Sequence, residues 1–96
     1  MTEKDPTLTA NGFIPVLTDT LSELDNTSRN KLAVEAKVRP VTINEIASGK
    51  AKQINFTTLA KILDGLNLIA QEKGIDKQYN VEDVFKFDYT KNHQSR

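Results

Sequence analysis

Cysteine is absent from this 96-residue chain, which excludes disulfide bonds and thiolate metal sites. The single histidine, His93, lies in a polar C-terminal segment, so neither a histidine-based triad nor a histidine-rich metal cluster is available. The four glycines are scattered and form no phosphate-binding loop. The one adjacent carboxylate pair, Glu82 and Asp83, suits the first turn of a helix better than acid–base catalysis. We therefore expect no enzymatic activity, no metal and no cofactor.

Long hydrophobic runs are also lacking. The longest apolar run is far too short to span a bilayer, and no basic-then-apolar signal opens the chain. We expect a cytoplasmic protein with no membrane partner, because a cysteine-free chain also suits a reducing compartment. A hydrophobic content of 38% is enough for the core of one domain of this length.

Net charge is zero, which at first argues against nucleic acid, but the charge is unevenly distributed. Residues 28–61 hold seven basic and two acidic side chains, a net charge of +5. Residues 1–27 carry −4 and residues 62–96 carry −1. Such a separation turns one surface toward polyanions and another away from them. A merely solvated helical surface would be the better interpretation if no helical periodicity accompanied the charge.

The N-terminal part of the chain predicts an arm and one helix. Residues 1–12 are polar and aperiodic, so we expect a disordered arm. A domain over residues 13–90 should follow. Its first helix should begin near Pro15, which suits a first-turn position, and should end at residues 25–27. Three leucines at helical spacing form its core stripe: Leu17, Leu21 and Leu24.

The next segment predicts two short helices joined by a tight turn, over about residues 28–50. Ser28 should cap a helix over residues 29–36. Pro40 occupies a natural first-turn position for a helix over residues 40–48, which Gly49 should end.

A longer fourth helix should begin at Asn55 and stop near Gly74. Its apolar residues follow the helical period closely: Leu59, Ile62, Leu63, Leu66 and Ile69. Gly65 costs this helix about 1 kcal/mol relative to alanine, which the apolar stripe should absorb.

The C-terminal segment allows two interpretations. Asn80 is suited to cap a short helix that begins at Val81, whereas the alternating aromatics of residues 84–89 suggest a strand. We prefer a helical turn that leads into a short extended tail, with residues 91–96 flexible. The aromatics Phe85, Phe87 and Tyr89 would either cover the end of the bundle or form a strand edge that pairs with a second copy.

The third helix has one apolar side and one polar side. Ile43, Ile46 and Ala47 fall together on a helical wheel and should face the core. The opposite side and the N-terminal end carry the candidate base-reading residues, which are Arg39, Pro40, Val41, Thr42, Asn44 and Glu45. Asparagine can pair with adenine, glutamate can accept from cytosine, and valine can contact the thymine methyl group. This arrangement suits a helix inserted in the major groove.

Further residues around this helix suit phosphate. The N-terminus of the second helix presents free N–H groups and a partial positive charge, and basic side chains follow the third helix. The candidate phosphate contacts are Ser28, Arg29, Ser48, Lys50, Lys52 and Asn55. Each would add affinity and salt dependence without sequence information.

At these residues the chain resembles the lambda-repressor-like, Cro-type (XRE) helix-turn-helix family. The similarity covers about residues 14–70, and residues 81–85 resemble the fifth-helix region of short members. The matching pieces are Leu32, Ala33, Val38, Thr42, Ile43, Ile46, Ser48, Gly49, Lys50, Phe56, Leu59 and Leu66. Lys37 stands where the family often has glycine and must therefore adopt a left-handed backbone. Pro40 and Val41 replace polar residues, so base readout should be partly apolar.

The resemblance implies an all-α, compact four- to five-helix DNA-binding domain. It also implies a bacterial, phage or plasmid transcriptional regulator, expected to be a repressor that binds double-stranded operator DNA as a homodimer. By the same resemblance, Arg39 caps the recognition helix and Pro40, Val41 and Glu45 read bases. The acidic N-terminal surface and the aromatic tail motivate an alternative, in which the fold serves a protein partner as an antitoxin or adaptor.

Overall fold

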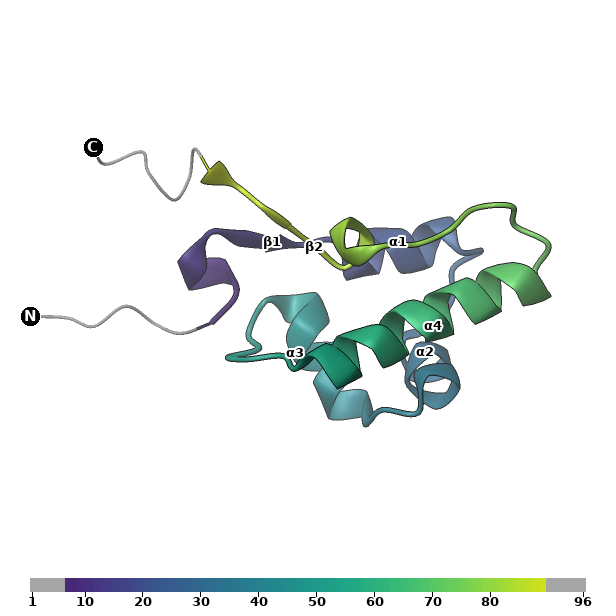
Figure 1. Ribbon diagram of the computed structural model, residues 1–96, viewed down its shortest axis with the longest axis horizontal. Coiled ribbons are helices and arrows are strands. Elements are labelled where there is room, and N and C mark those ends of the chain that lie inside the picture. Colours follow the sequence, from purple (N-terminus) through teal and green to yellow (C-terminus); the bar gives the residue numbers. More distant parts are fainter. Residues whose placement is uncertain (1–6, 90–96) are drawn as a thin grey trace, which may run out of the picture.

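Residues 7–89 are described by the computed structural model, in which four α-helices pack beside a two-stranded antiparallel sheet (Figure 1). The helices are α1 (Leu17–Glu23), α2 (Arg29–Ala36), α3 (Pro40–Ser48) and α4 (Phe56–Glu72). The strands are β1 (Phe13–Pro15) and β2 (Phe85–Phe87), each preceded by a short 3-10 turn: η1 (Thr9–Asn11) and η2 (Val81–Asp83). The mostly helical class is confirmed. The expectation of an all-α domain is wrong, because the two ends of the domain form a sheet.

The predicted capping residues of α2 and α4 act as expected. The Ser28 Oγ accepts the backbone N–H of Lys31 at 3.0 Å, and the Asn55 Oδ1 accepts that of Thr58 at 2.7 Å. Each bond satisfies one of the N–H groups that a helix start leaves without an intrahelical partner. Gly49 ends α3 with a φ of 80°, in the left-handed region that glycine adopts without steric cost. The bounds of α2 and α3 therefore match the sequence prediction.

The turn between α2 and α3 depends on Lys37. This residue has a φ of 61° and a ψ of 42°, the left-handed conformation that the sequence predicted for it. Its N–H donates to the Val34 carbonyl at 3.2 Å, and the N–H of Val38 donates to the Ala33 carbonyl at 3.1 Å. These bonds close the end of α2 and redirect the chain into α3.

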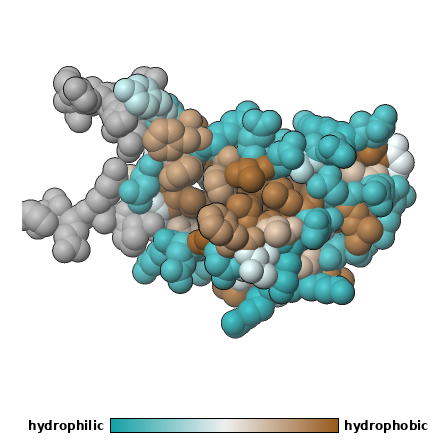
Figure 2. Space-filling model, in the orientation of Figure 1, coloured by the Kyte–Doolittle hydropathy of each residue, from teal (hydrophilic) through white to brown (hydrophobic). Residues whose placement is uncertain are grey.

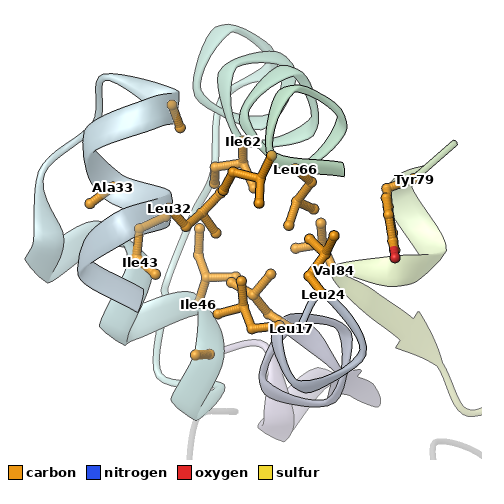
Figure 3. Packing of buried hydrophobic residues seen from close by; sticks show 14 of the residues in the cluster. Leu17, Leu24, Leu32, Ala33, Ile43, Ile46, Ile62, Leu66, Tyr79 and Val84 are labelled. Carbon is orange, nitrogen blue, oxygen red and sulfur yellow. The ribbon is translucent and has the colours of Figure 1, made fainter. Parts of the chain in front are cut away.

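The core lies where the four helices and the C-terminal segment meet. Its fully buried side chains include Leu17, Leu32, Ile43, Ile62 and Val84, which point toward a common centre (Figure 3). The apolar stripes predicted for α3 and α4 therefore supply the core, as expected.

Gly65 is buried where α4 crosses α2. A Cβ atom at Gly65 would lie 3.0 Å from the Ala36 Cβ and 3.1 Å from the Ala36 Cα. The helix-propensity cost of this glycine is therefore offset by the close approach that it allows.

Two N-terminal predictions are corrected. Pro15 lies in β1, not in the first turn of α1, which begins at Leu17. Proline lacks an N–H and fits a strand that has a neighbour on only one side. Residues 7–12 hold η1 and the turn into β1, although we expected them to belong to a disordered arm. The rest of that arm, residues 1–6, lies outside the described residues, as do His93 and the tail at residues 91–96.

The C-terminal segment combines both sequence interpretations. A helical turn, η2, begins at Val81 as preferred, but the extended segment after it pairs with β1 in antiparallel register, with Phe13 opposite Phe87. The Thr20 hydroxyl, which is buried, donates to the Asp83 carbonyl at 2.6 Å and holds η2 against α1. Phe13 packs edge-on against Phe85, with ring centroids 5.6 Å apart. Phe85 and Phe87 therefore both pack against Phe13 within one chain.

Candidate nucleic-acid interface

The orientation of α3 follows from its buried side. Ile43, Ile46 and Ala47 are at most 8% exposed, so the helix has one fixed rotation about its axis. That rotation exposes the residues on the opposite side: Val41, Asn44, Glu45 and Ser48. The polar face that the sequence predicted is therefore open to solvent along the whole helix.

The N-terminal end of α3 is also exposed. Arg39 occupies the N-cap position with an extended backbone, and its side chain makes no capping hydrogen bond. Pro40 follows in the first turn, and the Val41 side chain is 48% exposed. Thr42 is half-buried and faces a groove rather than open solvent. Arg39 forms no ion pair within residues 7–89, so these four residues offer one unneutralised cation, two apolar groups and one hydroxyl.

Asn44 and Arg29 are engaged with each other, which the sequence did not predict. The Arg29 Nη1 donates to the Asn44 Oδ1 at 3.4 Å, and the Arg29 Nη2 donates to the Thr18 Oγ1 at 3.2 Å. Arg29 therefore connects the start of α2 to both α1 and α3. Arg29 uses two of its five N–H donors in this network and Asn44 is bonded only through its oxygen, so both keep donors for a phosphate or a base.

A polar groove of about 590 Å³ lies between the second half of α3, the following loop and the start of α4. It brings together five predicted contacts from the base and phosphate sets: Thr42, Glu45, Lys50, Lys52 and Asn55. Gln53 and Thr58 line it as well and were missed. Gln53 lies between predicted contacts in the loop, so its position there was the available signal. The groove combines hydroxyl, amide, carboxylate and ammonium groups.

Two capping side chains keep hydrogen-bond donors for a ligand. Ser28 uses its oxygen to accept from Lys31, and its hydroxyl hydrogen has no acceptor within residues 7–89. Asn55 accepts through Oδ1, while its amide NH₂ group likewise makes no bond in the described chain. Ser48, by contrast, donates to the Glu45 carbonyl at 3.3 Å. Ser28 and Asn55 are therefore the better-placed neutral phosphate contacts.

Ion pairs divide the basic side chains into two groups. Lys31 bonds Glu35 at 2.9 Å, Lys77 bonds Glu23 at 2.8 Å, and Lys73 lies 3.4 Å from Asp25. The hydrogen bond to Glu35 raises the pKa of Lys31, and that to Glu23 raises the pKa of Lys77. Within residues 7–89, six cations of the basic segment lack an acidic partner: Arg29, Lys37, Arg39, Lys50, Lys52 and Lys61. Four of these cations lie in the two connections on either side of α3, while Arg29 lies at the start of α2 and Lys61 lies on α4.

The N-terminal segment holds the end of α3 and the basic loop. The Thr9 hydroxyl and the Thr9 N–H both donate to the Gly49 carbonyl, at 2.8 and 3.2 Å. The Leu8 N–H donates to the Ala51 carbonyl at 3.0 Å. Gly49 has no room for a side chain, because a Cβ atom there would collide with the Thr9 hydroxyl. Sequence analysis missed Thr9, since a contact across forty residues leaves no local signal.

Two structural findings and the comparisons with known proteins complete the description of this part of the molecule. Residues 7–89 hold no group of three or more His, Cys, Asp or Glu side chains suited to a metal ion. No helix in that part of the chain is long and apolar enough to cross a bilayer. Searches against known protein families, curated proteins and solved structures find no match to this chain.

Proposed function

We propose that this chain is a lambda-repressor-like, Cro-type helix-turn-helix regulator that inserts α3 into the major groove of operator DNA. The observation that carries the proposal is the exposed polar face of α3, bordered by cations that lack acidic partners. Phosphates attract exactly such unneutralised side chains, and an α-helix fits the width of the major groove. A repressor function and a homodimeric state belong to the same proposal.

Each part of the surface has a separate role in this proposal. Arg39, Val41 and Glu45 face base edges from α3, where arginine favours guanine and glutamate favours cytosine. Ser28, at the start of α2, contacts phosphate on one side. Lys50, together with its neighbours in the polar groove, contacts phosphate on the other. The phosphate contacts fix the register of α3, and the α3 side chains supply the sequence preference.

Selection from random DNA duplexes tests this proposal. The expected result is an enriched motif with two-fold symmetry, bound by the wild-type protein and lost when Arg39 and Glu45 are both replaced by alanine. The double variant should keep weak, salt-sensitive binding, since its phosphate contacts remain. Absence of binding to any duplex at low salt would refute DNA binding, and binding without an enriched motif would refute sequence-specific recognition.

A second candidate function is a protein-interaction module of the antitoxin or adaptor type. An apolar groove beside the sheet, lined mainly by Phe13, Leu63, Val81, Phe85 and Phe87, favours this function. Exposed apolar surface of this kind is typical of protein-interaction sites, and the groove shares no lining residue with the polar groove. Recovery of a stable complex with a different protein, combined with no gel shift at low salt, would favour this function over the first.

A further inference from the structure

The apolar groove lies between the sheet and α4 and has a volume of about 550 Å³. Its floor and walls are mainly apolar side chains: Phe13, Leu63, Val81, Phe85 and Phe87. Two of them are widely open to solvent, with Phe87 49% and Val81 42% exposed. Figure 2 shows the apolar surface gathered across the middle of this face, with polar surface on both sides. The groove is therefore a continuous surface and not a set of scattered residues.

A further exposed apolar side chain lies at the start of α4, on the same side of the helix as Leu63. Phe56 precedes Leu63 by seven residues, which is two helical turns, so both lie on one stripe of the helix. The Phe56 side chain is 89% exposed. Soluble monomers seldom leave large contiguous apolar surfaces uncovered, and such surfaces mark interaction sites. We therefore expect an apolar surface of a binding partner to cover these side chains.

The charges at the rim of the groove indicate which occupant fits. Glu82 and Lys86 both line it, both are exposed, and neither forms an ion pair within residues 7–89. In a two-fold symmetric contact, residue i of one copy meets residue j of the other, and j meets i. In such a contact, Glu82 of each copy would face Lys86 of the other copy, so the interface would contain this ion pair two times. The surface is thus complementary to itself in both apolar character and charge.

The same lysine argues against pairing of strand edges. Lys86 is the middle residue of β2, which is only three residues long. Short edge strands with lysine resist strand addition, and two copies joined at Lys86 would place like charges opposite each other. Contact through the face of the groove avoids both costs.

We propose that the apolar groove, with Phe56 and the charged pair Glu82 and Lys86, is the surface on which a second copy of this chain docks. This inference rests on the proposed function, because a dimer is needed to place two copies of a recognition helix on a symmetric operator. It concerns the free protein, however, so it can fail while DNA binding stands.

Sedimentation equilibrium of the full chain without DNA tests the proposal. Wild type should show a concentration-dependent dimer. Phe87→Asp should raise the dimer dissociation constant by about tenfold or more, as expected for a central apolar contact. The matched control is Val34→Asp, because Val34 is 64% exposed on α2 and lines neither groove. Circular dichroism establishes that each variant is folded.

Charge exchange gives a second measurement that does not depend on the aromatic variant. Lys86→Glu and Glu82→Lys should each weaken the dimer, and the double exchange should restore it, since opposite charges then face each other again. A monomeric wild type at every soluble concentration would overturn the proposal, whatever else fills the groove. A dimer that Phe87→Asp and the single exchanges leave unchanged would overturn it too. Separate measurement of DNA binding distinguishes either failure from failure of the proposed function.

Discussion

Replacement of Lys50 and Lys52 by glutamine should both weaken DNA binding and reduce its dependence on salt. The two side chains line the polar groove after α3, and within residues 7–89 neither has an acidic partner. Their charge is therefore available to phosphate. Glutamine keeps a polar side chain of similar length, so the loop should retain its conformation while it loses two positive charges.

The size of the effect follows from counterion release. Each phosphate that a cation neutralises contributes about 0.9 to the slope of log affinity against log salt, so the double variant should lose about 1.8 for each bound copy, or about 3.6 for the proposed dimer. Between roughly 50 and 200 mM salt, the wild type should then lose about tenfold more affinity than the variant for each bound copy, and on the order of a hundredfold more for the dimer. The difference between the two proteins should be largest at low salt and should shrink as salt screens the contacts.

Fluorescence anisotropy of a labelled duplex across a salt series measures both quantities. The matched control is the double variant Lys73→Gln and Lys77→Gln, which removes the same charge from two residues already in ion pairs. Its slope should equal that of the wild type. Equal slopes for all three proteins would refute the assignment of the loop cations to phosphate. An equal loss of slope in both variants would show that net charge, not position, governs binding.

Three further changes test separate steps of the reasoning. Glu45→Ala should change the motif selected from random duplexes while leaving the salt slope unaltered, since Glu45 is placed at a base; an unchanged motif would contradict that role. Lys37→Gly should raise the free energy of unfolding by about 1 kcal/mol in urea titrations, because glycine adopts the left-handed backbone without a Cβ clash; a loss of stability would contradict this account. Ser28→Ala should lower that free energy by about 1 kcal/mol in the same assay through loss of the N-cap bond, whereas no change would show that the bond contributes little.

Local sequence signals predicted the helix-turn-helix segment well. Ser28, Pro40, Gly49 and Asn55 each act on backbone groups within a few residues, so their effects can be inferred without knowledge of the fold. The left-handed Lys37 was predicted from the family resemblance instead, because it stands at a turn position where that family often has glycine. The buried side of α3 follows from helical periodicity alone.

The sheet could not be predicted in the same way. The alternating aromatics of residues 84–89 suggested β2, but its partner β1 is only three residues long and comes from the opposite end of the described chain, so no local pattern indicated the pairing. Pro15 suited both a helix start and a strand with one neighbour, and only the pairing with Phe85 decides between them. The bond between Arg29 and Asn44 depends likewise on the packing of α2 against α3, which sequence spacing does not specify.

The segment before β1 changes how the candidate interface should be understood. Its polar, aperiodic sequence gives no sign of a role, yet Thr9 places two hydrogen bonds on the Gly49 carbonyl, where α3 ends. Gly49 leads directly into the basic loop, so the direction in which that loop leaves α3 depends on a residue that carries no charge. The same segment continues into β1, and β1 pairs with the strand that lines the apolar groove. The short sheet therefore connects the proposed DNA-binding surface to the proposed dimer surface, and in the proposed dimer β1 would help to fix the position of α3 relative to the second copy.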